Sequence, residues 1–158
     1  MSAADATRTD DNLSNILTDA GVGVVAGAAG TALMTLILYS AFRAGAAGGS
    51  IERLGSLVYL DAVLPQPLAG FVTFAVGGIF FWPLVFASLE PRIPGDDRTV
   101  KGAVFAMILW TGFLVGFFRT DAGSGFALYA LYTGAAHLIY GVALGGVFGR
   151  FVSDEHEE

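Results

Sequence analysis

His137 is the residue of this sequence with the widest choice of chemistry. It lies in a long uncharged segment, residues 122–149, whereas the other histidine, His156, belongs to the acidic C-terminal end. An imidazole can transfer a proton, ligate a metal or haem, or hold a hydrogen bond. Thr133 lies one turn before His137, and Tyr140 lies one turn after it. On a helix these three polar side chains would share one face, which predicts a buried polar group.

The rest of the sequence offers little that could complete a catalytic or metal site around His137. There is no cysteine, which excludes disulfides and thiolate-held metals. Met34 and Met107 are weak metal ligands. The long uncharged segments contain no pair of carboxylates that could ligate a metal or transfer protons. The stretch "GVGVVAG" (residues 21–27) is similar to a dinucleotide-binding loop, but no strand precedes it. We therefore predict no catalytic residue, no metal site and no cofactor, with His137 as the single candidate ligand.

Three roles for His137 remain open. In the first, which we favour, the ring is neutral and buried, and it bonds a hydroxyl or carbonyl group that fixes how its helix packs. In the second, it contacts a partner protein or a proton path. In the third, it ligates a haem or a quinone in an electron carrier. Gly134 and Gly141 lie beside His137 on the helix, so the ring should point into a helix contact and away from lipid.

The segments that carry these residues are too apolar for a soluble domain. The chain is 54% hydrophobic and 14% charged, with a mean hydropathy of +0.66, whereas soluble domains are about 25% charged. A helix needs about 20 apolar residues to cross the roughly 30 Å hydrocarbon layer. The third uncharged segment is short, but Lys101 and Arg119 flank it and can reach the interface. The fold class is therefore all-α, a polytopic membrane protein with four transmembrane helices over residues 21–42, 67–89, 102–118 and 122–149.

Other classes fit the pattern less well. A soluble bundle would need polar helix faces, and these segments leave none for water. A transmembrane β-barrel would alternate apolar and polar residues, and these segments are apolar all round. A cleaved signal peptide would begin with basic residues, and the residues before the first segment are acidic.

The charged residues divide the chain and orient it. We assign residues 1–18 to an acidic N-terminal tail, residues 19–151 to the four-helix domain and residues 152–158 to an acidic C-terminal tail. We expect both tails to be mostly disordered or frayed. Four crossings place both termini on one side, and that side holds five of the eight Lys and Arg residues. The excess favours cytoplasmic termini in the cell membrane.

The connection between the first two segments contains a further element. Leu54, Leu57, Val58 and Leu64 fall at helical spacing, and Pro65 ends the pattern. We predict a short interfacial helix there. Asp61 falls on the same stripe. It either turns toward lipid headgroups or is a buried acid in a re-entrant segment.

Small residues indicate how the helices pack. In lipid, small-xxx-small patterns let two helix backbones approach closely, either within one bundle or between subunits. The second segment instead carries bulky aromatic residues, which we expect to face lipid, and Pro83 should kink it. Those aromatic residues are Phe71, Phe74, Phe80, Phe81, Trp82 and Phe86. The predicted helix-packing residues are Gly23, Gly27, Gly30, Gly112, Gly116, Gly134, Gly141, Gly145 and Gly149.

The charge balance bears on the source and on the partners. Acidic residues number 14 against 8 basic ones, and Lys101 is the only lysine. An acidic surface poor in lysine suits concentrated salt, which predicts a halophilic source. A genome that favours arginine codons is the alternative. The balance also argues against a nucleic-acid partner, which would select a basic patch.

Two stretches carry a family resemblance. "GVVAGAAGTALMTLILYSA" (residues 23–41) and "HLIYGVALGGVFG" (residues 137–149) resemble an uncharacterised family of small four-helix membrane proteins common in haloarchaea. The resemblance covers about residues 20–150 and implies the four-helix fold. Relatives are sometimes labelled as subunits of haem–copper terminal oxidases. This chain lacks the many histidines that a catalytic oxidase subunit needs.

Together these observations favour a non-catalytic accessory subunit of a larger respiratory membrane complex, and the resemblance implies that this complex is a terminal oxidase. Its expected partners are the lipid bilayer and the other subunits. The alternative is a small transporter or channel that acts as a homo-oligomer. Asp61 and a similarity between "ILYSAF" (37–42) and "ILWTGF" (108–113) favour this alternative, while the scarcity of polar residues in the first three segments opposes it.

Overall fold

In the computed structural model, the described residues are 3–45, 50–118 and 125–151, and within them every element is helical. Four helical spans are long and apolar enough to cross a membrane, namely Thr18–Arg43, Gln66–Arg92, Arg98–Phe117 and Phe126–Phe151. This confirms the predicted class and the short helix between the first two spans. The elements are α1 (Ala3–Arg43), α2 (Ser50–Leu57), η1 (Leu60–Ala62), α3 (Gln66–Val76), η2 (Gly77–Phe81), α4 (Trp82–Leu89), η3 (Glu90–Arg92), α5 (Arg98–Phe117) and α6 (Phe126–Phe151).

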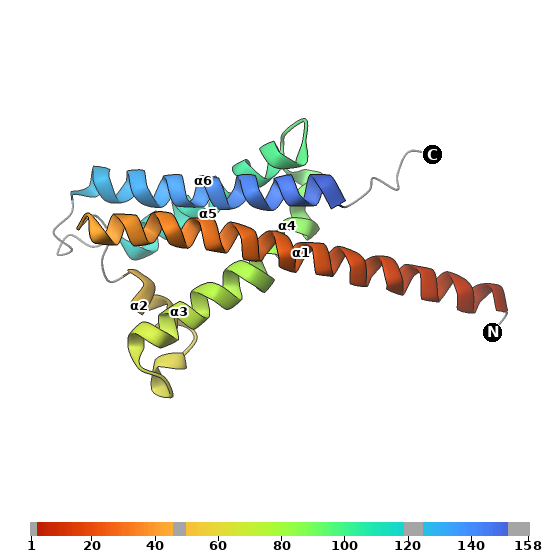
Figure 1. The fold of residues 1–158 in the computed structure, drawn as a ribbon, viewed down its shortest axis with the longest axis horizontal. Coiled ribbons are helices and arrows are strands. Elements are labelled where there is room, and N and C mark those ends of the chain that lie inside the picture. The colour runs from red at the N-terminus through yellow and green to blue at the C-terminus, as the bar shows by residue number, and fades with distance from the viewer. Residues whose placement is uncertain (1–2, 46–49, 119–124, 152–158) are drawn as a thin grey trace.

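Helix α1 is longer than the membrane requires. Its 41 residues span about 60 Å at 1.5 Å per residue, and its N-terminal part projects beyond the bundle (Figure 1). The expectation of a mostly disordered N-terminal tail therefore differs from the structure, which is helical from Ala3. Residues 3–18 contain no glycine or proline, so nothing ends the helix there. The N-terminal end of α1 and the C-terminal end of α6 lie at the same end of the bundle (Figure 1).

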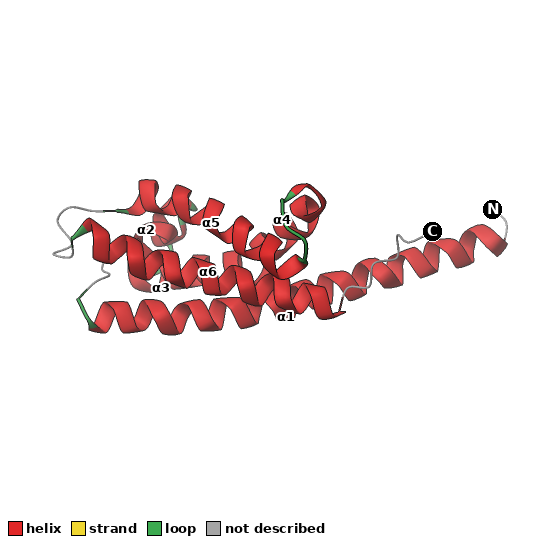
Figure 2. Cartoon of the chain, turned by 90° about the horizontal axis from the view of Figure 1, so that it is seen from above, coloured by secondary structure: helices red, strands yellow, loops and turns green. Residues whose placement is uncertain are grey.

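Helix α6 is the centre of the bundle. It packs along both α1 and α5, and the three helices lie side by side (Figure 2). On the α5 side, Gly141 lies against the Gly102 carbonyl and Gly145 against the Arg98 carbonyl, so that a side chain at either position would collide with backbone. Gly134 and Gly149 also lie at this contact, beside Trp110 and Arg98. The two backbones can approach this closely because neither helix carries a side chain between them.

Helix α1 meets the middle of the second span. A methyl group at Gly27 would lie 2.6 Å from the Ile79 carbonyl oxygen, and one at Gly30 would lie 2.8 Å from the Tyr140 ring. Gly23 faces Phe148 at 3.5 Å. The second span thus touches α1 at η2, its π-helical turn, whereas α3 diverges from α1 (Figure 1).

Two of the predicted packing residues, Gly112 and Gly116, make no helix contact within the described chain. Both are exposed on α5, and no described atom lies within 4 Å of a side chain added at either one. The aromatic prediction needs correction. Phe71, Phe80 and Phe81 are about half exposed, but Phe86 is fully buried. Pro83 lies in the first turn of α4, and Phe86 of the same helix lies in the core beside Phe105 and Phe148.

The glycine contacts generate a matched pair of substitutions. Gly145→Leu should lower the free energy of unfolding by about 3 kcal/mol, because the new side chain enters the α5 backbone. Gly116→Leu should leave it unchanged or slightly raised, because the side chain meets open space and leucine favours a helix over glycine. Unfolding of both variants in one detergent measures the difference. Equal loss of stability in both would contradict these contacts.

Candidate functional site

An apolar cavity of about 770 Å³ lies between α1, α2, α3, α5 and α6. Its walls are aliphatic and aromatic side chains from all five helices, including Met34, Leu54, Phe74, Leu109 and Phe113. No charged residue lines it within the described ranges. Ligand sites of about 300–1,000 Å³ with mostly apolar walls and a few polar groups are typical of small-molecule binding. The polar groups therefore decide what this cavity can hold.

His137 is one of these polar groups. The side chain is 7% exposed, and its ring packs on Phe113 with the centroids 5.1 Å apart. Its Nδ1 atom lies 2.8 Å from the Thr133 carbonyl oxygen. A carbonyl can only accept, so Nδ1 must carry the hydrogen, and the Nε2 atom of the neutral ring is then an acceptor. No described residue donates a hydrogen bond to Nε2.

Thr31 is a second polar group of the cavity, and the sequence analysis missed it. Its side chain is 6% exposed. Its hydroxyl oxygen is buried without a hydrogen-bond partner in the described chain. It lies against Gly78, where an added side chain would collide with it. An unsatisfied buried hydroxyl costs about 1–3 kcal/mol, and this oxygen is covered by neighbouring atoms and does not open into the cavity.

Tyr140 lines the cavity and also completes the backbone of η2. The Trp82 N–H donates to the Gly77 carbonyl, five residues back, as a π-helix requires. In this pattern the next donor, at position 83, would serve Gly78, but Pro83 has no N–H. The Tyr140 hydroxyl donates to the Gly78 carbonyl oxygen at 2.8 Å instead. A side chain of α6 thus replaces a backbone donor that α4 lacks.

The remaining predicted polar residues lie outside the cavity. Thr133 is buried at the α5–α6 contact, where it accepts from Trp110 Nε1 at 3.1 Å and donates to the Tyr129 carbonyl at 2.8 Å. Asp61 lies in η1 and accepts from the Ser56 hydroxyl at 2.8 Å. The structure therefore brings His137 and Tyr140 together with Thr31, and leaves Asp61 apart. The sequence signal that could have revealed the hydrogen bond between the second span and α6 is the pair Gly77 and Gly78 followed by Pro83. Pro83 lacks the N–H that would pair with the Gly78 carbonyl.

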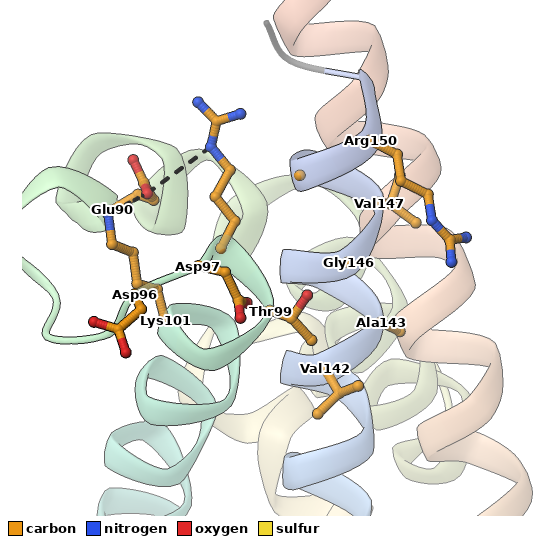
Figure 3. A pocket seen from close by; sticks show the side chains of 12 residues that line it. Glu90, Asp96, Asp97, Thr99, Lys101, Val142, Ala143, Gly146, Val147 and Arg150 are labelled. Carbon is orange, nitrogen blue, oxygen red and sulfur yellow. Dashed lines mark hydrogen bonds and ion pairs between the residues drawn. The ribbon is translucent and has the colours of Figure 1, made fainter. Parts of the chain in front are cut away.

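A second cavity, of about 710 Å³, is charged and lies where η3 meets the ends of α5 and α6 (Figure 3). The Glu90 carboxylate accepts from Lys101 Nζ at 2.6 Å and lies 3.9 Å from Arg98 Nε. Arg150 extends from the other side of α6 (Figure 3). Asp97 caps α5 by accepting from the Val100 N–H at 2.9 Å, and this bond lowers the pKa of the Asp97 carboxyl below its usual range. These pairs join η3 to α5 at one end of the bundle.

The Tyr140 hydrogen bond can be tested by removing its hydroxyl. Tyr140→Phe should lower the free energy of unfolding by about 1 kcal/mol or more, because the buried Gly78 carbonyl then loses its donor. Tyr132→Phe is the control, since that hydroxyl, also on α6, bonds to no described residue and should cost nothing. Unfolding in detergent measures both. Equal stability of the two variants would show that the Gly78 carbonyl does not need Tyr140.

Comparison with known proteins gives one result. No curated protein and no solved structure matches the chain. The model of the family of unknown function DUF6789 matches residues 17–158, which cover all four spans and both cavities. This chain therefore belongs to the DUF6789 family.

Proposed function

We propose that this chain is a non-catalytic accessory subunit that docks into a larger membrane complex through α5. The observation that supports this is the open glycine face of that helix. A side chain added at Gly112 or Gly116 would meet no described atom within 4 Å, whereas the seven other glycines predicted to pack all lie at contacts within the chain.

The residues around these glycines form one stripe. Ile108 is 61% exposed and Val115 is 87% exposed. On the same face of α5, Gly112 lies between these two residues and Gly116 lies beside Val115. Two bulky side chains thus border a shallow recess that reaches the α5 backbone. A second transmembrane helix fits such a recess because its backbone can approach without a side chain in between.

The cost of the glycines also favours a partner. A glycine inside a helix is about 1 kcal/mol less favourable than alanine. Contact with lipid does not require glycine, because lipid chains pack equally well on alanine or leucine. A partner helix would offset this cost through close packing.

The nature of the complex rests on the sequence. The resemblance to proteins labelled as terminal oxidase subunits points to a respiratory complex, and the acidic balance of 14 against 8 charges points to a halophilic cell. We assign the protein to the cell membrane as a multi-pass protein with cytoplasmic termini, in keeping with the excess of basic residues at that end. In this proposal His137 is a buried hydrogen-bonding residue of the subunit and takes no part in electron transfer.

Gentle extraction from native membranes tests the docking face. The wild-type chain should copurify with larger, haem-containing chains, and Gly116→Leu should lose at least about nine-tenths of them because the leucine fills the recess. Gly21→Leu is the matched control, since a side chain there also meets open space but lies on α1. Retention of the same partners by Gly116→Leu would contradict the proposal. Recovery of the wild type only as a homo-oligomer would favour the transporter alternative.

A further inference from the structure

We propose that the apolar cavity binds a lipophilic alcohol, a membrane-soluble molecule whose hydroxyl group donates a hydrogen bond to His137. Ile108 and Gly112 of the α5 docking face also line this cavity, but the alcohol site does not depend on the accessory role. It rests on the hydrogen-bonding capacity of His137 and on the absence of charge among the described residues that line the cavity.

His137 requires a donor. Its Nδ1–H is used by the Thr133 carbonyl at 2.8 Å. The Nε2 atom therefore presents a lone pair toward the cavity that the residue lines. A ligand with only acceptor atoms, such as a ketone, an ether or an ester, leaves that lone pair unsatisfied. A hydroxyl group satisfies it by donating its proton.

The lining excludes charged headgroups. No Lys, Arg, Asp or Glu is among the described residues that line the cavity. An ionised carboxylate or phosphate placed there would lose its hydration with no cation to replace it. The volume of about 770 Å³ is ample for a chain of several isoprene units or a fused ring system. The cavity therefore selects an uncharged, mostly hydrocarbon molecule with one hydroxyl group.

Farnesol and farnesyl methyl ether distinguish this site from a plain apolar cavity. The ether keeps the hydrocarbon and the acceptor oxygen but lacks the proton that His137 requires. We expect the full-length protein in phosphatidylcholine nanodiscs to retain radiolabelled farnesol at least tenfold more tightly than the ether, with empty nanodiscs as background. His137→Phe should weaken the retention of farnesol about tenfold and leave that of the ether unchanged. Ser88→Ala, which removes an exposed hydroxyl outside the cavity, should bind both probes as the wild type does.

Two results would overturn the proposal. One is equal retention of the alcohol and the ether by the wild type, which would make the cavity a passive space for lipid chains. The other is wild-type retention of farnesol by His137→Phe. If His137→Phe does not fold, as judged by circular dichroism and gel filtration, the comparison of the two probes on the wild type still decides the matter.

Discussion

The hydrogen bond from the Tyr140 hydroxyl to the Gly78 carbonyl holds the middle of the bundle together. Lipid offers no water to a free carbonyl, so an unpaired backbone group at this depth is costly. Pro83 has no N–H, and in the π-helical turn this missing donor leaves the Gly78 carbonyl without a backbone partner. The Tyr140 hydroxyl of α6 donates to that carbonyl at 2.8 Å instead. Gly27 of α1 lies against the same turn, and Gly30 lies against the Tyr140 ring. Three spans therefore meet at one hydrogen bond.

The cavity follows from this meeting point. The second span is fixed to α1 and α6 at η2, while α3 runs outward from there at an angle to the other helices (Figure 1). The space between α3 and the core helices is also lined by α2, which packs on α3 through Gly55 and Ala69. The Tyr140 hydroxyl gives its proton to the Gly78 carbonyl at this turn. His137, whose Nε2 atom has no donor among the described residues, is the polar group proposed to receive a ligand.

The sequence predicted the spans because an uncharged apolar segment of about 20 residues has few other uses. It also indicated that His137 would be buried, since small residues flank it. It could not predict the helix from Ala3, because a polar stretch without glycine or proline is compatible with either helix or disorder. The glycine patterns that contain Gly112 and Gly145 look alike in the sequence, yet only Gly145 packs against the backbone of a neighbouring helix. A small-residue pattern shows that a backbone can be approached but does not say by what. Thr31 gave no signal, because the lack of a hydrogen-bond partner for a buried hydroxyl depends on its neighbours in the fold.

The most direct measurement is a double-mutant cycle between Pro83 and Tyr140. Tyr140→Phe is made in the wild type and in a Pro83→Ala background, and the free energy of unfolding is measured for all four proteins. Alanine restores an N–H to the second span, so the carbonyl of Gly78 no longer depends on Tyr140. The two substitutions should therefore couple by about 1 kcal/mol, with Tyr140→Phe costing much less beside Pro83→Ala than in the wild type. An equal cost of Tyr140→Phe in both backgrounds would show that the hydroxyl does not replace the missing donor, and would contradict the central claim.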